Sequence, residues 1–198
     1  MAHNGEINQT VMTRLIAEAQ KVIGNKQNYP VIIAIDGNCG SGKTFYGAKL
    51  ATTLNACLIH CDDFFLPKQL RTKERLAEVG GNIHYERLRT LLEEVKTENP
   101  PSTFSAYNCS TDTYEEKTLP CSNVVIVEGS YSLHSNLAEF YDLKILFTVD
   151  KQTQYKRLLN REGEQGIANF INKWIPLENR YFENLDTADC IVIDTSGK

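Results

Sequence analysis

The sequence lacks the features that mark membrane and secreted proteins. No window approaches the roughly 18 consecutive apolar residues that a membrane-spanning helix needs. Residues 1–24 lack the unbroken apolar core of a secretory signal, and the six cysteines form no CxxC pair. We therefore expect a cytoplasmic protein with reduced thiols, no membrane partner, and neither a zinc site nor a disulfide framework.

An excess of positive charge is also absent. The chain has 21 Lys and Arg residues against 25 Asp and Glu residues, which gives a net charge of −4 at pH 7. Nucleic acids and anionic membranes reward a large positive field, so we expect neither as a partner. A small phosphate ligand stays compatible with this balance, because a few local donors can hold one.

What the chain does contain is a set of five short apolar runs separated by segments of helical periodicity. The runs cover residues 31–36, 56–61, 123–130, 143–150 and 189–194. This alternation indicates an α/β fold with a five-stranded, mostly parallel sheet flanked by helices. In such sheets, ligands bind at the carboxyl ends of the strands.

The remaining segments give the expected domain organisation. Apolar residues recur at helical spacing over 8–23, so we expect an N-terminal helix within residues 1–29. Residues 30–198 then form the main unit of a chain that is a single domain overall. Residues 102–120 have the pattern of a small hairpin inserted into that domain, and residues 84–99 that of a helix.

The segment GNCGSGKT, residues 37–44, matches the phosphate-loop pattern G-x-x-x-x-G-K-[ST] at every fixed position. Its glycines permit backbone angles that a Cβ would forbid, and amides at the start of the following helix can surround a phosphate. Lys43 can reach the β- and γ-phosphates of a nucleotide, and Thr44 offers a hydroxyl to Mg²⁺. The expected ATP site consists of Gly37, Asn38, Cys39, Gly40, Ser41, Gly42, Lys43 and Thr44.

Acidic residues end two of the apolar runs. Asp62 and Asp63 follow the second run, and Glu128 ends the third. Phosphoryl transfer to a hydroxyl uses one carboxylate to accept or orient the hydroxyl proton and another near the metal. Asp62 or Asp63 suits the first role and Glu128 the second, although acidic residues after strands also serve as turn formers and helix caps. The guanine-specificity motif N-K-x-D is absent, which favours a small-molecule kinase over a GTPase.

The order of these motifs resembles the uridine kinase-like branch of the P-loop kinases, near the phosphoribulokinases and type I pantothenate kinases. The resemblance covers about residues 30–195 and is carried by IAIDGNCGSGKT, HCDDFFLP, GGNIHYERL, VVIVEGS, RLLNR and WIPLENRYFENLDTADCIVIDT. It implies ATP-dependent phosphorylation of a primary hydroxyl, typically the 5′-OH of a nucleoside. It also implies a P-loop fold with a hairpin insertion over the acceptor site and a helical lid.

The resemblance assigns roles to individual residues. Asp62 would be the base that accepts the hydroxyl proton, and Arg157 and Arg161 resemble the lid arginines that close over the phosphates. The implied sets are Lys43, Asp62, Arg157 and Arg161 for catalysis, Thr44, Asp62 and Glu128 for Mg²⁺, and Asp62, Asp63, His84 and Tyr107 for the acceptor.

The acceptor itself is the part that the motifs define least. Cys109 stands where the family has an aromatic residue, and His84-Tyr85-Glu86 stands where a nucleoside kinase more often has aspartate-rich sequence. A pyrimidine nucleoside is the first expectation. The alternatives are a related kinase that acts on pantothenate, nicotinamide riboside or a sugar, and a non-catalytic nucleotide-binding regulatory protein. The sequence leaves the oligomeric state open, a homo-oligomer included.

Overall fold

A computed structural model of the chain describes residues 8–27 and 30–196. Its centre is a five-stranded sheet with the strand order β2-β5-β1-β6-β7, in which every pairing is parallel. The strands are β1 (Val31–Gly37), β2 (Cys57–His60), β5 (Val124–Glu128), β6 (Leu143–Thr148) and β7 (Cys190–Asp194). The predicted α/β fold is therefore confirmed, and each strand ends within two residues of its predicted run.

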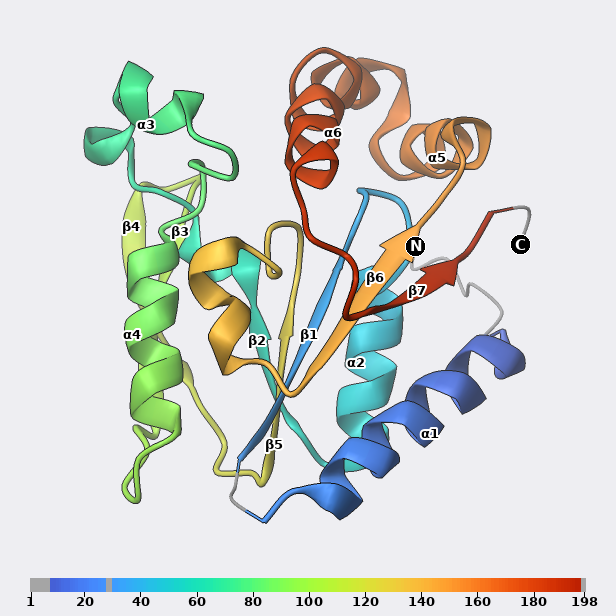
Figure 1. Cartoon of the computed structure of the whole chain (residues 1–198). Helices are drawn as coiled ribbons and strands as arrows, with labels where there is room; N and C mark the ends of the chain where they lie inside the picture. The colour runs from blue at the N-terminus through green and yellow to red at the C-terminus, as the bar shows by residue number, and fades with distance from the viewer. Residues whose placement is uncertain (1–7, 28–29, 197–198) are drawn as a thin grey trace.

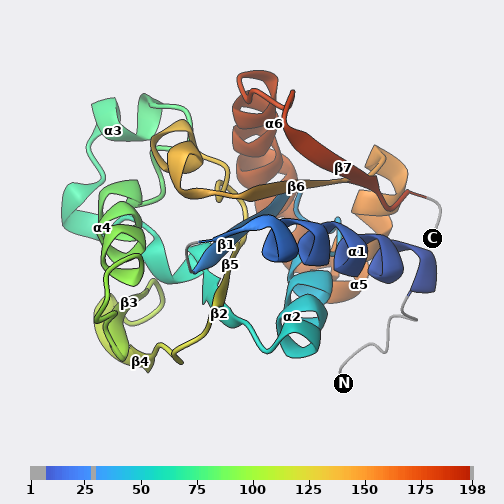
Figure 2. The same ribbon diagram turned by 60° about the horizontal axis from the view of Figure 1, so that its bottom comes forward.

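Helices cover both faces of the sheet (Figures 1 and 2). On one face lie α1 (Gln9–Asn25) and α2 (Lys43–Leu54), and on the other lie α4 (Tyr85–Val95), α6 (Ile175–Glu183) and the short helix η3 (Ser135–Phe140). Strand β1 is buried along its whole length because its alternate residues enter the two separate cores. Ile33 and Ile35 pack with α1 and α2, whereas Ile32 and Ala34 pack with α4 and η3.

The predicted N-terminal helix is amphipathic and packs on the sheet. Val11, Met12, Leu15 and Ala19 are buried on its inner face, and the Asn8 side chain caps its first turn by accepting from the amides of Thr10 and Val11. In the described part of the chain, none of the helices combines the length and the apolarity that a membrane crossing requires.

Two groups of elements rise above the carboxyl edge of the sheet, on opposite sides (Figure 1). The first holds η1 (Cys61–Phe64), η2 (Lys68–Leu70), α3 (Lys73–Ala77) and the hairpin of β3 (Thr103–Asn108) and β4 (Thr113–Thr118). The second is α5 (Lys151–Asn169), the π-helical turn η4 (Phe170–Trp174) and α6. Helix α5 is interrupted at Gly163, whose φ of 70° and ψ of 178° are not helical.

Candidate active site

The phosphate loop connects β1 to α2 and has a shape that depends on glycine. Gly40 and Gly42 have φ values of 78° and 92°, in the region that residues with a Cβ rarely adopt. At Gly37 an added Cβ would lie 2.3 Å from the Phe147 carbonyl oxygen. The loop therefore needs small residues both for its own backbone and for its contact with β6.

The start of α2 leaves donors for an anion. Gly42 precedes the helix and supplies no side-chain cap, so the first amides of α2 keep their hydrogens for another acceptor. The Lys43 ammonium reaches back over the loop, with Nζ 3.4 Å from the Asn38 carbonyl oxygen. The Ser41 hydroxyl is buried without a partner. This arrangement agrees with the predicted binding of a polyphosphate to residues 37–44.

Two predicted carboxylates meet at the same edge of the sheet. Strands β2 and β5 are neighbours, with His60 opposite Glu128, so Asp62 lies two residues beyond the partner of Glu128. The protein atoms around the Asp62 side chain raise its pKa above the usual value by desolvation, and the positive charge of Lys43 opposes this shift. Asp62 is exposed at this edge of the sheet, and the charges of both Lys43 and Glu128 act on it.

Of the two carboxylate oxygens of Glu128, one has a hydrogen-bond partner among the described residues and the other has none. Its side chain is buried, and Oε1 lies 2.7 Å from His60 Nδ1, a contact that raises the pKa of His60. Oε2 is buried without any hydrogen-bond partner. A buried carboxylate oxygen without a partner is costly, so it points to a ligand that the site is built to receive.

The donor set fits Mg²⁺ held jointly with a nucleotide. Glu128 Oε2, Asp62 and the exposed hydroxyl of Thr44 are all oxygen donors, which Mg²⁺ prefers. Within the described ranges, no group of three His, Cys, Asp or Glu side chains could hold a metal ion by itself. That is the expected situation for Mg²⁺ in a kinase, where waters and phosphate oxygens complete the coordination.

The two predicted arginines of α5 have different surroundings. Arg157 donates to the Gly40 carbonyl at 2.9 Å and to the Thr195 carbonyl at 2.9 Å, so it braces the outside of the phosphate loop. Arg161 lies over the Phe170 ring and is about half exposed, and its charge acts on the Cys39 thiol. Arg161 pairs through Nε with Glu162 at 2.5 Å, whereas Arg157 contacts the phosphate loop directly.

Glu178 lies within one of the motifs that carry the family resemblance, but the sequence assigned it no role in this site. It comes from α6, is 4% exposed, and accepts a hydrogen bond from the Cys39 amide at 2.8 Å through Oε2. Its Oε1 accepts from the Ser130 hydroxyl at 2.7 Å. The Glu178 carboxylate therefore connects α6 to the phosphate loop and to the turn after β5.

Replacing Glu178 should destabilise the protein markedly. Glu178→Ala leaves the Cys39 amide and the Ser130 hydroxyl without their acceptor, at about 1–3 kcal/mol for each buried donor. We expect a loss of about 3 kcal/mol in the free energy of unfolding, measured by urea denaturation. Glu183→Ala, an exposed position of the same helix, is the matched control and should change it by less than about 0.5 kcal/mol. Equal effects of the two substitutions would contradict the role given to Glu178.

Asp36, at the end of β1, is a second residue that the sequence did not single out. It is fully buried and accepts from the amides of Gly37, Tyr131 and Leu133 and from the Tyr181 hydroxyl. Burial raises its pKa to about 6, although these four donors favour the carboxylate. The side chain joins the first residue of the phosphate loop, the turn after β5 and α6.

Cys39 lies inside the phosphate loop and is poorly reactive. It is 7% exposed, and burial, followed by the charge of Glu178, raises its pKa to about 12. Because the thiolate is the reactive form, iodoacetamide at about pH 7.5 should modify the exposed Cys109 and Cys121 and spare Cys39. Peptide mass spectrometry measures this directly, and early labelling of Cys39 would show that the loop opens in solution.

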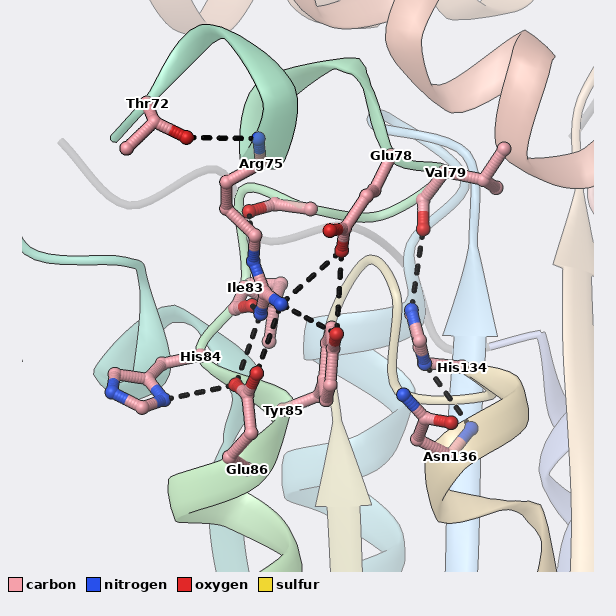
Figure 3. Close-up of polar contacts among 11 residues, drawn as sticks. Thr72, Arg75, Glu78, Val79, Ile83, His84, Tyr85, Glu86, His134 and Asn136 are labelled. Carbon is pink, nitrogen blue, oxygen red and sulfur yellow. Dashed lines mark hydrogen bonds and ion pairs between the residues drawn. The ribbon is translucent and has the colours of Figure 1, made fainter. Parts of the chain in front are cut away.

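The predicted acceptor residues are only partly brought together. Asp62, Asp63 and Tyr107 line one cavity of about 280 Å³ with Phe65, Cys109 and Lys117, and Asp63 pairs with Lys117 at 2.6 Å. The Tyr107 hydroxyl donates to Asp112. His84 is not part of this cavity, because its ring turns to Glu86, with Nδ1 3.1 Å from Oε2 (Figure 3).

A second cavity of about 400 Å³ adjoins the first and shares Phe65 and Cys109 with it. It lies between the segment around α3 and the helices η4 and α6, and Trp174 and Tyr131 are in its wall. The Tyr131 amide donates to Asp36, which also accepts from the Gly37 amide, so this wall of the cavity is connected to the start of the phosphate loop. The two cavities together form the space in which an acceptor can approach Asp62.

The fold and this site are similar to those of the P-loop kinases, which are α/β proteins with a phosphate loop, a parallel sheet and overhanging helices. No family model matches the sequence. The chain is 26% identical over 193 residues to a uridine kinase of Bacillus mycoides, which covers 86% of this chain and 88% of that enzyme. It is 27% identical over 165 residues to the uridine kinase of Saccharomyces cerevisiae, which covers 73% of this chain and only 32% of the yeast protein.

The solved structures agree with the sequence relatives. The structure of a possible uridine kinase from Bacillus stearothermophilus superimposes with a TM-score of 0.68 at 21% identity, over 93% of this chain and 100% of that one. The likeness to the uridine kinase-like branch of the P-loop kinases, expected from the motifs, is thereby confirmed.

Proposed function

We propose that this protein is an ATP-dependent kinase that phosphorylates a hydroxyl group of a small molecule. The observation that carries the proposal is the placement of Asp62, at the carboxyl edge of the sheet, within the electrostatic reach of Lys43 in the phosphate loop. The kinase relatives support it. A nucleotide-binding regulatory protein would need the loop but no carboxylate in this position.

The proposed chemistry uses few residues. The acceptor hydroxyl oxygen attacks the γ-phosphorus of ATP, the bond from that phosphorus to the β–γ bridging oxygen breaks, and ADP leaves. Asp62 takes the hydroxyl proton, and Lys43 with the amides at the start of α2 stabilises the phosphate charge. Bound Mg²⁺ would neutralise phosphate charge, and Thr44, Asp62 and Glu128 would hold it. Arg161, on the lid, would face the phosphates.

The acceptor has two candidates. A pyrimidine nucleoside, phosphorylated at its 5′-OH, is the one that the names of the relatives suggest. A different metabolite, such as pantothenate, nicotinamide riboside or a sugar, is the other, and the charges of the second cavity favour an acidic one. We also propose a cytoplasmic location, which the six free cysteines of the described chain support.

The test is ATP consumption with Mg²⁺ over a panel of hydroxyl compounds that includes uridine and cytidine. We expect ADP release that depends on one acceptor and is abolished by chelation of Mg²⁺. Tight ATP binding without acceptor-dependent turnover across the panel would instead support the regulatory alternative.

A further inference from the structure

Three positive side chains line the second cavity. Arg71, Lys173 and Arg180 come from the segment before α3, from η4 and from α6. Over residues 8–27 and 30–196, no carboxylate forms an ion pair with any of them. Positive charges gathered around one cavity repel each other, so an uncompensated group of three indicates a site for an anion.

The contacts that these side chains do make leave donors available. Arg71 donates through Nε to the Leu66 carbonyl at 2.7 Å and through Nη2 toward the Cys109 sulfur at 3.7 Å. Arg180 donates through Nη2 to the Ala77 carbonyl, and Lys173 lies over the Trp174 ring. All these hydrogen-bond partners are neutral, so the protein orients both guanidinium groups without a paired carboxylate. The carboxylate of Asp112 interacts with Arg71 only at longer range and is itself paired with Lys68.

The acid in the cavity wall does not cancel this charge. Glu78 accepts from Arg75 Nη1 at 3.2 Å and from the Tyr85 hydroxyl at 3.3 Å. Figure 3 shows Arg75 between Glu78 and Glu86, with the Tyr85 ring beside it. Glu78 therefore shares the cation Arg75 with Glu86, and in the cavity wall itself one acid stands against three cations.

The deepest polar groups of the cavity are donors as well. The Tyr131 hydroxyl and the Asn82 amide nitrogen are both buried next to each other in the cavity wall, and neither has a well-formed hydrogen bond to any further group of the described chain. Tyr131 is 3% exposed and has a left-handed backbone with φ of 73°, which an aromatic residue adopts only where its surroundings enforce it. Burial raises the pKa of Tyr131, so its hydroxyl keeps its proton to donate.

We propose that the phosphate acceptor carries an anionic group, a carboxylate or a phosphate, in addition to the hydroxyl that is phosphorylated. Arg71 and Arg180 bind this group, Lys173 adds charge, and Tyr131 and Asn82 supply the remaining donors. The shared residues Phe65 and Cys109 place the hydroxyl end in the adjoining cavity, beside Asp62. The proposal rests on the kinase function proposed above and specifies its acceptor.

The chemistry of the cavity separates an anion from a pyrimidine base. A pyrimidine edge presents both donors and acceptors and needs both in return. The Asn82 carbonyl and the Tyr131 hydroxyl can accept hydrogen bonds, but the three cations of the cavity have no counterpart on a neutral base. Carboxylate and phosphate oxygens accept hydrogen bonds only, and guanidinium groups match them well. The apolar side chains Leu76, Val79, Trp174 and Leu177 then contact the carbon skeleton.

The test compares matched acceptors in the ATP-consumption assay. The pairs are a hydroxy acid with its neutral amide and a sugar phosphate with its parent sugar, alongside uridine and cytidine. In one of the two pairs, we expect the anionic compound to have a kcat/KM at least tenfold higher than that of its neutral partner. A preference for the hydroxy acid would identify the anionic group as a carboxylate, and a preference for the sugar phosphate would identify it as a phosphate. Preference for a neutral compound would overturn the anionic acceptor and leave the kinase intact, whereas no turnover with any compound would overturn both.

Substitutions locate the effect. Arg180→Gln and Arg71→Gln should each raise KM for the anionic acceptor about tenfold or more and leave KM for ATP within twofold. Arg89→Gln, on the exposed side of α4 and paired with Glu93 and Glu139, is the control and should change neither constant. An unchanged acceptor KM in both cavity variants would overturn the proposal.

Protection of Cys109 from alkylation measures acceptor binding in a protein that keeps all the cavity residues. Its outcome therefore does not depend on whether the Arg71 and Arg180 variants fold correctly. Cys109 lies in both cavities and is exposed, so Cys121→Ser leaves it as the exposed thiol for labelling. The anionic acceptor should slow alkylation of Cys109 at least threefold, and its neutral partner should not. Equal protection by both members of the pair would contradict recognition of the charge.

Discussion

Asp62→Asn is expected to lower kcat by about 10²- to 10⁴-fold while ATP affinity changes little. The amide is nearly the same size as the carboxylate but cannot accept the hydroxyl proton, and general base catalysis contributes about this much. The measurement is ADP release under saturating acceptor, together with ATP binding by calorimetry. Asp63→Asn is the matched control, because the neighbouring carboxylate is paired with Lys117. It should keep kcat within about tenfold.

The pH profile gives an independent check on Asp62. Desolvation raises the pKa of this carboxyl, and the base must be ionised to act. Activity should therefore fall as the pH is lowered through that pKa, with a midpoint above the ordinary value of 3.8 for an aspartate. The residual activity of Asp62→Asn should lack this limb. A surviving limb, or full activity in the variant, would show that another group takes the proton.

Gly37→Ala is the second substitution with a large expected effect. The added Cβ would lie 2.3 Å from the Phe147 carbonyl oxygen and 2.7 Å from the Phe147 Cβ, so either β6 or the loop must shift. Because the clash involves backbone, we expect ATP binding to weaken by at least about tenfold, with a loss of stability of about 2–4 kcal/mol. Calorimetry of ATP binding and urea denaturation measure the two effects.

A second glycine of the chain provides the contrast for Gly37. Gly24 lies within α1, and an added Cβ there would meet nothing within 4 Å. Gly24→Ala should leave ATP binding unchanged and stabilise the protein slightly, because alanine favours a helix by up to about 1 kcal/mol over glycine. If Gly37→Ala also bound ATP normally, the close packing of the loop against β6 would not be needed for nucleotide binding.

The strands and the phosphate loop could be predicted because their signals are local. Apolar runs bounded by turn residues gave the five strands, and GNCGSGKT requires a strand before it and a helix after it. The parallel order of the strands then brought Asp62 and Glu128 to one edge. This part of the site follows from sequence pattern and from the regular geometry of α/β sheets.

The contacts that hold the site together could not be predicted in the same way. Glu178 meets Cys39 across 139 positions of sequence, and Tyr181 meets Asp36 across 145. No spacing rule reports such pairs, because each depends on where a whole helix docks. For His84 the contact that decides its position is local. Its ring contacts Glu86, two residues away, and it does not line the cavity that holds Asp62 and Tyr107.

The carboxylate of Asp36 connects the phosphate loop to the cavity proposed for the acceptor. It accepts hydrogen bonds from the amide of Gly37, the first residue of the phosphate loop, and from the amide of Tyr131. Tyr131 lies in the wall of the second cavity. A ligand that tightens either amide restricts the other through a single buried side chain. Occupancy by ATP should then strengthen acceptor binding, and thermodynamic reciprocity requires the acceptor to favour ATP by the same factor.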